Sequence, residues 1–227
     1  MKIRSLLWLS MLGVWNAALA AETGPYIGLE GGVNWASSQY LRQQQLDFVQ
    51  MNFKKPLDSG YVYGGLVGWR FLSGVRTELE LNYRKNTLSS FSQRYYEGNS
   101  SAAGRGSEAF TGAFANVWYD IPWRLHITDN AVLRPYVGGG MGYGRLTIKG
   151  LAAEGVHFGQ THNDDVAAWQ LGGGLIAQIG DDYSVSLDYR YLRTASANYG
   201  LIEGLPSQDV ITHYRAESLM LGLHYNF

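Results

Sequence analysis

The sequence predicts an all-β protein, an eight-stranded antiparallel transmembrane β-barrel preceded by a cleaved N-terminal signal peptide. Two observations lead to this prediction. Apolar and polar residues alternate with a period of two along most of the chain, and helical spacing nowhere dominates. No apolar run reaches the roughly 18–20 residues that a spanning helix needs, so a helical membrane protein is excluded.

The first residues have the parts of a secretory signal. Residues 6–14 form a short apolar stretch, and an Ala-Leu-Ala motif at 18–20 fits a cleavage site. An uncleaved anchor is the alternative, but the stretch is too short to span and no stop-transfer segment follows it. We therefore expect residues 1–20 to be a signal peptide and residues 21–227 to be one β-barrel domain. The positive charges of the signal are Lys2 and Arg4.

The composition narrows the possible functions. Lysine and arginine number 18 against 19 aspartates and glutamates, so no basic surplus points to a nucleic-acid partner. The absence of cysteine excludes disulfides, iron–sulfur clusters and thiolate zinc sites. Glycine supplies 29 of the 227 residues, whereas charged residues make up only 16%. A secreted chain of this composition is not typical of a cytosolic enzyme.

Residues 75–84 show the alternation most clearly. Leu79 and Leu81 fall on one face, and Glu78 and Glu80 fall on the other. Similar patterns predict eight strands, each with an uncharged apolar face and about the ten residues that a tilted strand needs to cross a bilayer. The predicted strands comprise residues 27–35, 61–71, 75–84, 113–120, 136–144, 167–179, 183–191 and 218–227.

The connections between these strands alternate between long and short. A membrane barrel is expected to have long connections on its outer side and short turns on the other. Residues 121–134 depart from this pattern, because an enlarged connection, bounded by Pro122 and Pro135, stands where a short turn is expected. The long connections are residues 37–58, 86–107, 149–164 and 195–211, and the tight turns are residues 72–74 and 180–182.

A secreted, water-soluble barrel or sandwich is the competing architecture, and it would bury the apolar face. Its other face should then be evenly polar, yet glycine occupies every second position from 138 to 144 on that face. Small residues suit the narrow inner wall of a closed barrel. The C-terminal Phe227, at the end of an alternating strand, also has no explanation in a soluble protein.

Four segments carry a resemblance to a known family. They are Pro25-Tyr26-Ile27-Gly28, Asn116-Val117-Trp118-Tyr119-Asp120, Pro135-Tyr136-Val137-Gly138 with its following glycines, and Gly222-Leu223-His224-Tyr225-Asn226-Phe227. The mature chain resembles, over its whole length, the small eight-stranded outer-membrane β-barrel family of the OmpA/OmpX and neisserial surface-protein type. These segments indicate the architecture and hardly bear on activity.

The resemblance implies a location in the cell outer membrane of a Gram-negative bacterium, with the short turns and both ends of the mature chain in the periplasm. Members of the family end in an aromatic residue that the barrel-assembly machinery recognises, and Phe227, with Tyr225 two residues before it, matches this assembly signal. Outer-membrane lipids, lipopolysaccharide and host surface molecules are further expected partners. We expect a monomer.

Charged residues recur on the face that would line the lumen. Eight strands leave an interior just wide enough for side chains to fill, and each unpaired buried charge would be costly. The near balance of five acidic and four basic residues favours a network of ion pairs that plugs the lumen, and an ion-selective pore lining is the alternative. The candidate network comprises Glu30, Arg70, Arg76, Glu78, Glu80, Arg84, Asp120, Asp188 and Arg190.

The histidines do not indicate catalysis. A lipid A deacylase of this size would need histidine, serine and a carboxylate together on the outer wall, and no histidine is followed two residues later by serine. His157 and His162 lie near Asp164 and Asp165, but their spacing matches no metal-ligand motif, and a solvated loop is the preferred interpretation. We therefore expect no catalytic residue, no bound metal and no cofactor.

The long outer connections combine aromatic and cationic residues. Such surfaces suit host proteins, glycans or lipopolysaccharide phosphates, although these residues could equally pack on one another and on lipid headgroups. The sequence therefore predicts an outer-membrane surface protein with a structural or interaction (adhesin-like) role and no enzymatic activity. A narrow channel for small solutes or ions is the alternative, and a lipid A-modifying enzyme is less favoured. The recognition candidates are Arg42, Phe48, Phe53, Arg94, Tyr95 and Tyr96.

Overall fold

The computed structural model describes the barrel and part of its connections. The backbone is described for residues 23–37, 39–43, 52–55, 59–95, 98–128, 131–153, 156–157, 161–180, 182–198 and 210–227. Side chains are described for residues 23–37, 59–87, 106–125, 132–150, 161–180, 182–198 and 213–227. The expected signal peptide and its cleavage site lie outside the described residues. Within these residues, no helix has the length and apolar character needed to traverse a membrane.

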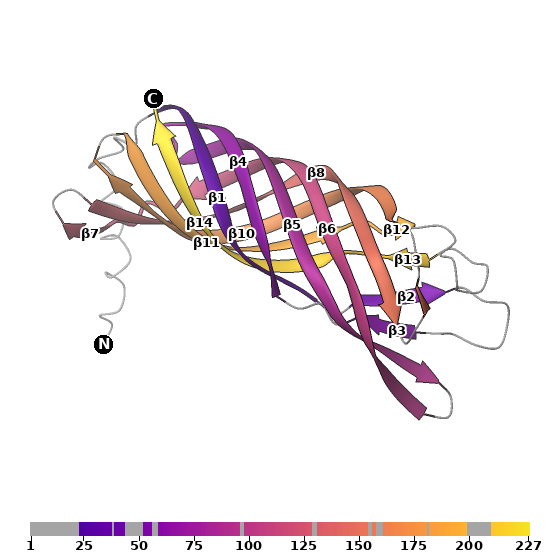
Figure 1. Cartoon of the computed structure of the whole chain (residues 1–227). Helices are drawn as coiled ribbons and strands as arrows, with labels where there is room; N and C mark the ends of the chain where they lie inside the picture. Colours follow the sequence, from indigo (N-terminus) through magenta and orange to yellow (C-terminus); the bar gives the residue numbers. More distant parts are fainter. Residues whose placement is uncertain are drawn as a thin grey trace, which may run out of the picture.

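Eight long strands form a closed antiparallel barrel (Figure 1). The last strand pairs with the first from Tyr26↔Asn226 to Ala36↔Ala216, which leaves the barrel without an open edge. The predicted all-β, eight-stranded antiparallel fold is confirmed. In barrel order the strands are β1 (Gly24–Ala36), β4 (Ser59–Arg70), β5 (Val75–Tyr95), β6 (Gly98–Asp120), β8 (Ala131–Ala153), β10 (His162–Ile179), β11 (Tyr183–Thr194) and β14 (Arg215–Asn226).

Short strands extend the barrel at both ends (Figure 1). At one end, which we call the outer end, β2 pairs with both β3 and β13, and β3 pairs with β5. At the opposite end, which we call the inner rim, β7 pairs with β8. The short strands are β2 (Gln39–Gln43), β3 (Asn52–Lys55), β7 (Leu125–Thr128), β9 (Val156–His157), β12 (Ala197–Asn198) and β13 (Val210–Thr212).

Strand pairing at the outer end continues further than the sequence predicts. The prediction that residues 86–107 form a loop is wrong, because β5 and β6 stay paired as far as Tyr95↔Gly98. Strands β8 and β10 also run into the predicted connection 149–164. Serine- and glycine-rich segments have no apolar face to offer lipid, so the hydrophobic alternation stops at the membrane boundary while backbone pairing goes on.

The inner rim has the tight turns. Gly74 (φ 80°) connects β4 to β5 and Gly180 (φ 65°) lies between β10 and β11, both in the left-handed conformation that glycine adopts without strain. The backbone N–H of Phe227 donates to the carbonyl of Pro25 at 3.1 Å. The start of β1 and the end of β14 therefore lie side by side at this rim.

The enlarged connection 121–134 contains a small hairpin rather than an irregular turn. Strand β7 pairs with the beginning of β8, for example at Leu125↔Leu133. Pro135, expected to bound the connection, lies within β8, which begins before the predicted start at Tyr136. Proline has no backbone N–H to donate, so it usually marks the end of a strand. At a strand position whose nitrogen forms no ladder hydrogen bond, proline is tolerated and does not mark a strand end.

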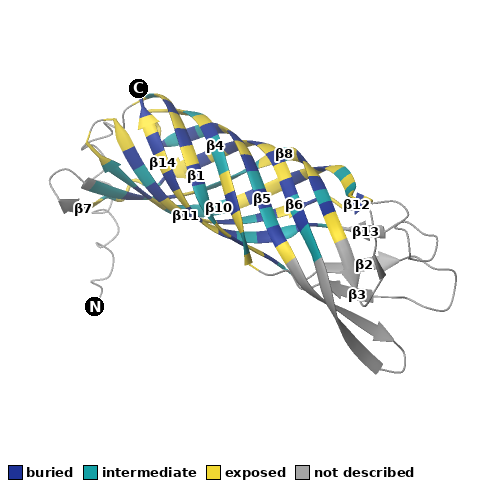
Figure 2. Ribbon diagram, in the orientation of Figure 1, coloured by how far each residue is buried: buried dark blue, intermediate teal, exposed yellow. Residues whose placement is uncertain are grey.

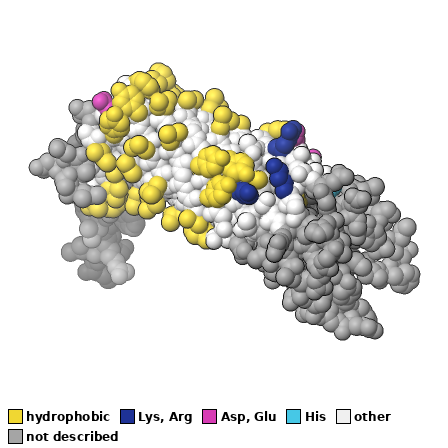
Figure 3. All heavy atoms as spheres, in the orientation of Figure 1, with side chains coloured by type: hydrophobic (Ala, Val, Ile, Leu, Met, Phe, Trp, Pro, Cys, Tyr) yellow, Lys and Arg dark blue, Asp and Glu magenta, His cyan; other side chains and the backbone are white. Residues whose placement is uncertain are grey.

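The faces of the barrel strands agree with the predicted alternation (Figure 2). Leu81 is 67% exposed on the outside, whereas its neighbour Glu80 is 1% exposed in the lumen. Exposed apolar side chains cover much of the barrel wall that is visible in Figure 3. A lipid phase covers such a band in membrane barrels. Exposed aromatic residues include Trp35, Tyr61, Trp69, Phe71, Tyr119, Tyr143, Trp169, Tyr183 and Tyr225.

Glycines on the lumen side of β8 make room for rings from β6. A Cβ atom on Gly142 would lie 2.6 Å from the Phe114 ring, and one on Gly138 would lie 2.7 Å from the Trp118 ring. Both separations are shorter than real Cβ contacts. The alternating glycines of residues 138–144 therefore allow bulky side chains to cross a narrow lumen.

Leu81→Arg is expected to lower the free energy of unfolding by about 2–4 kcal/mol, because the guanidinium would lie in the middle of the lipid-facing band. Thr87→Arg, on the same face of β5 but beyond that band, is the matched control, with an expected cost of about 0–1 kcal/mol. Urea unfolding in lipid vesicles, followed by tryptophan fluorescence, measures both costs. Equal values at the two positions would contradict the assigned depths.

Phe227→Ser is expected to reduce the amount of folded barrel in outer membranes without reducing export of the precursor. The reason is that Tyr225 and Phe227, whose rings lie 4.9 Å apart, match the assembly signal. Phe71→Ser removes another exposed aromatic near the inner rim and serves as the control. The folded fraction is measured as the heat-modifiable band on a detergent gel, and an unchanged band for Phe227→Ser would exclude the signal role.

Candidate functional site

One guanidinium joins three carboxylates in the middle of the lumen. Nη2 of Arg190 lies 2.5 Å from Oε1 of Glu30 and 2.9 Å from Oδ2 of Asp188. Nη1 of the same arginine lies 3.0 Å from Oε2 of Glu80. The guanidinium also lies 5.2 Å from the centre of the Trp118 ring, within cation–π range. Three strands, β1, β5 and β11, thus contribute to one cluster, which we call the Arg190 hub.

A second cluster lies nearer the inner rim. Nε of Arg76 is 2.9 Å from Oδ1 of Asp120, and its Nη1 is 3.2 Å from Oε1 of Glu78. Arg70 approaches the second oxygen of Asp120 at 4.0 Å. The Arg76 guanidinium stacks 4.6 Å from the centre of the Tyr136 ring. This cluster has two cations for two carboxylates, whereas the Arg190 hub has one cation for three.

Neutral donors supply the remaining bonds of the buried carboxylates. Glu78 accepts from the Tyr26 hydroxyl at 2.6 Å and from Nε1 of Trp118 at 2.7 Å. Asp188 accepts from the Tyr136 hydroxyl at 2.6 Å. Hydrogen bonds of this kind stabilise a buried carboxylate without a second cation. The amide donors to Glu80 are Asn82 (2.7 Å), Asn116 (2.6 Å) and Gln170 (2.8 Å).

Arg84 differs from the other lumen arginines. Among the described residues it forms no ion pair with a carboxylate within 4.0 Å, although carboxylates were expected to meet the lumen arginines across the barrel. Its Nη1 donates to the Ser218 hydroxyl at 2.6 Å and to Oδ1 of Asn34 at 3.4 Å. Asn34 continues the chain of hydrogen bonds to Tyr214 at 2.7 Å. Oxygens of neutral side chains therefore solvate this cation.

An apolar cluster lies inside the barrel around and beyond Arg84, towards the outer end. These side chains point inward, are almost fully buried and pack together as one group. The sequence did not predict this cluster, because members such as Phe110, Leu146 and Leu192 lie beyond the ends of the predicted strands. We call the cluster the outer cap, and its members are Ala36, Phe110, Phe114, Leu146, Ile148, Val166, Ala168, Leu192, Ala197, Tyr214 and Ala216.

The lumen also holds polar residues that the sequence analysis did not select. Glu108 and Arg134 are buried, and both have the inward parity of their strands. Extending the period-two pattern along β6 and β8 would have found them. Further buried neutral residues of the lumen that were not selected as site candidates are Tyr26, Asn34, Asn82, Asn86, Gln170, Tyr214 and Ser218.

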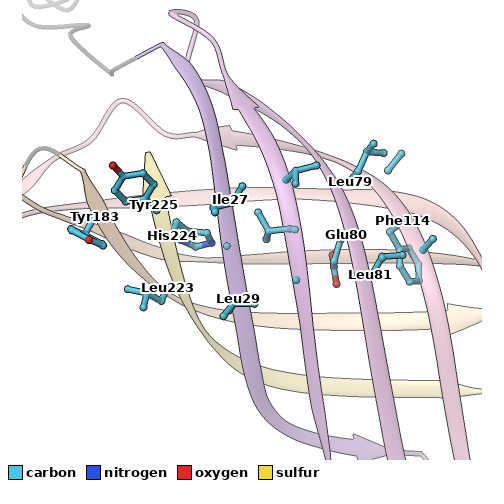
Figure 4. Close-up of a pocket in the computed structure, with 16 residues that line it drawn as sticks. Ile27, Leu29, Leu79, Glu80, Leu81, Phe114, Tyr183, Leu223, His224 and Tyr225 are labelled. Carbon is cyan, nitrogen blue, oxygen red and sulfur yellow. The ribbon is translucent and has the colours of Figure 1, made fainter. Parts of the chain in front are cut away.

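An apolar groove of about 990 Å³ lies on the barrel wall, across β11, β14, β1, β4, β5 and β6 (Figure 4). Its lining consists mainly of outward-facing side chains such as Leu29, Leu79, Leu81 and Leu223. In a membrane, the acyl chains of the bilayer are the expected contents of such a groove. It offers little polar chemistry that would select a specific ligand.

The structure gives backbone positions for only four of the outer recognition candidates. Arg42 lies in β2, Phe53 in β3, and Arg94 and Tyr95 in β5. Arg42 and Arg94 are both in register with Asn52, on either side of it. The topology therefore brings residues from two separate connections to one row of a small sheet. Phe48 and Tyr96 lie outside the described residues.

Asp164 and Asp165, the two aspartates near His162, form hydrogen bonds with other groups of the protein. Asp165 accepts from Nε of Arg145 at 2.7 Å and from its Nη2 at 2.9 Å, and these hydrogen bonds hold the pKa of the carboxyl below its usual range. Asp164 accepts from the backbone N–H of Asn198 at 2.6 Å. Within the described residues, no group of three or more metal-type side chains is placed to hold an ion.

The sequence matches a family model described as "Outer membrane protein beta-barrel domain" over residues 5–227. The chain belongs to this family. The barrel therefore lies in the outer membrane of a Gram-negative bacterium, as the sequence analysis predicted. A curated "Outer membrane protein" of Gluconacetobacter diazotrophicus is 31% identical over 130 residues, which cover 53% of this chain and 32% of the relative. The match to this relative spans about a third of its length.

A solved outer-membrane barrel, OprG, has the same fold at low sequence identity. OprG of Pseudomonas aeruginosa aligns with a TM-score of 0.53 and 14% identity, over 90% of this chain and 98% of its own. Neisserial surface protein A aligns with a TM-score of 0.47 and 15% identity, over 90% of this chain and 97% of its own. At such identities, only the fold is comparable.

Arg190→Met is expected to lower the free energy of unfolding by about 3–5 kcal/mol, because it leaves three buried carboxylates without their shared cation. Arg145→Met is the matched control, since the exposed Arg145–Asp165 pair is open to solvent and should contribute little. Urea unfolding of the two variants in vesicles measures the difference. A negligible cost for Arg190→Met would mean that water hydrates these carboxylates and that the lumen is wet.

Proposed function

We propose that this outer-membrane barrel is closed to solutes and acts as a structural or adhesin-like surface protein through its outer segments. The outer cap is the observation that supports this proposal most. Phe110, Leu146 and Leu192 are 0% exposed and belong to this one packed cluster, to which β6, β8 and β11 contribute. A channel would need a continuous wet path through this layer.

Below the cap, the paired charges also support a closed lumen. Arg190 and Arg76 each contact two or more carboxylates, so an ion that entered would have to break buried ion pairs. Eight-stranded barrels have space for side chains in the interior and little else. The lumen then serves the stability of the barrel rather than transport.

The strand extensions and connections at the outer end, which we call the outer segments, are neither lipid-facing wall nor lumen. They are therefore the part of the molecule proposed to recognise partners. Residues 86–95 prolong β5 by about 30 Å along the strand, at the usual rise of roughly 3.3 Å per residue. The row that contains Arg42, Asn52 and Arg94 gives the outer sheet two cationic positions, one on each side of Asn52. Positions of this kind suit phosphate, sulfate or carboxylate groups on glycans and proteins.

The position of His224 supports the absence of enzymatic activity. Its ring lies in the lumen, 6.0 Å from the Tyr26 ring and in register with Ser184. A lipid-modifying enzyme needs its catalytic groups on the wall that lipids touch. In the described part of the wall, apolar and aromatic side chains predominate.

Purified protein in planar bilayers is expected to give only rare, small conductance steps, because the cap and the ion-pair clusters obstruct the lumen. Replacing residues 89–105 by a two-residue Asn-Gly turn should abolish binding to cells while leaving the barrel heat-modifiable. This replacement keeps Asn86, whose side chain bonds to Asn34 in the lumen.

The matched control replaces the β7 hairpin at the inner rim by the same turn, and it should bind cells as the intact protein does. Large, steady, ion-selective currents from the intact protein would contradict the closed barrel and favour the narrow channel. Equal binding by both shortened variants would contradict a role for the outer hairpin.

A further inference from the structure

A ring of cations lies just beyond the outer aromatic residues of the barrel wall. On three strands that run towards the outer end, an outward-facing tyrosine is followed two residues later by lysine or arginine on the same face. Figure 3 shows Lys and Arg side chains gathered beside hydrophobic ones, at the boundary with the outer segments. Lipid headgroups occupy this depth in a membrane. The three pairs are Tyr83 and Lys85 on β5, Tyr143 and Arg145 on β8, and Tyr191 and Arg193 on β11.

The cations of this ring are not in equivalent surroundings. Arg145 has a carboxylate partner in Asp165, which it contacts through two nitrogens. Arg193 has no ion-pair partner among the described residues. The residue directly opposite it on β14 is a second arginine, Arg215. Like charges in directly opposite positions of neighbouring strands destabilise a sheet.

Arg215 provides an independent sign of an absent partner. Its Nε atom is buried and has no hydrogen-bond partner, and no ion pair is formed by its guanidinium within the described residues. Glu217 is on the same face two residues along β14, but it stands opposite Tyr191 in the ladder. Two arginines in directly opposite ladder positions therefore have donor capacity that the described side chains do not use.

We propose that Arg193 and Arg215 together bind a phosphate monoester carried by a glycolipid of the outer leaflet. A phosphate offers several anionic oxygens to two guanidiniums and removes their mutual repulsion. The site opens sideways on the barrel wall, next to Trp169, which is in register with Arg193, and Tyr191, whose ring lies 5.5 Å from that of Trp169. Amphipathic rings at this depth suit a ligand with acyl chains below its headgroup.

This assignment extends beyond the proposed surface role, because the site lies on the barrel wall and needs neither the outer hairpin nor a closed lumen. It also distinguishes Arg193 from Arg145 on physical grounds. Arg145 already has a bidentate carboxylate, so a lipid phosphate would have to displace Asp165. Arg193 and Arg215 would break no ion pair of the described residues on binding.

The test uses the full mature chain, folded in a sugar-headgroup detergent that contains no phosphate. The probes are fluorescent lipopolysaccharide, the same lipopolysaccharide after enzymatic removal of its phosphates, and inorganic phosphate as a competitor. The Arg193→Gln/Arg215→Gln double variant should bind phosphorylated lipopolysaccharide roughly tenfold more weakly than the wild type. Arg145→Gln should bind as the wild type does, and the dephosphorylated probe should not distinguish the three proteins.

Equal binding of the phosphorylated probe by the wild type and the double variant would overturn the proposal. Displacement of the probe by inorganic phosphate at a matching concentration would also overturn it, because the site would then bind free phosphate and not a lipid headgroup. Loss of binding in Arg145→Gln to the same extent would mean that diffuse positive charge, rather than the Arg193–Arg215 pair, attracts the lipid.

A second measurement is the change in thermal stability caused by Arg193→Gln, whose expected sign differs from that of a purely structural role. Without phosphate in the detergent, Arg193→Gln should raise the midpoint of heat modification, because it removes the repulsion from Arg215. Adding phosphorylated lipopolysaccharide should stabilise this variant less than it stabilises the wild type. A variant that is less stable than the wild type in both media would overturn the proposal.

Discussion

The hydrocarbon core of a membrane offers no hydrogen bonds, so every backbone group of a spanning segment must be bonded within the protein. The β14–β1 ladder meets this requirement, because it turns a row of strands into a closed wall. Closure with only eight strands leaves a narrow interior, and any charged side chain inside must find its partners there. The Arg190 hub, the Arg76 cluster and the neutral oxygens around Arg84 are three solutions to this one constraint.

The two sides of the wall have opposite energetic requirements, and the same strands meet both. Outside, Leu81 and its neighbours gain from contact with lipid tails and need no specific geometry. Inside, Glu80 is useful only because Arg190 and three amides surround it. A substitution on the outside is therefore judged by hydrophobicity and depth, whereas one in the lumen is judged by the partners it leaves behind. The alternating glycines of β8 add a third requirement, because they give the rings of β6 their space.

Sequence reasoning was most reliable where lipid imposes a pattern. The alternation around Leu79 and Leu81 identified the strands and both faces, since a one-residue slip would expose Glu80 to lipid. It was least reliable where lipid imposes none. The hairpin of residues 86–107 has no apolar face, so its pairing left no hydrophobic signal. The outer cap was missed because members such as Phe110 lie beyond the ends of the predicted strands, and the partners of Arg84 depend on side chains brought together from distant strands.

The apolar cap lies at the outer end, and the polar clusters lie on its inner side. In the closed barrel proposed above, the medium outside the cell would have no route past this cap to the charged interior. The ionic clusters would then be insulated from changes in external salinity or acidity. A bacterium could thus display many copies of such a protein on its surface without compromising the permeability barrier that its outer membrane provides.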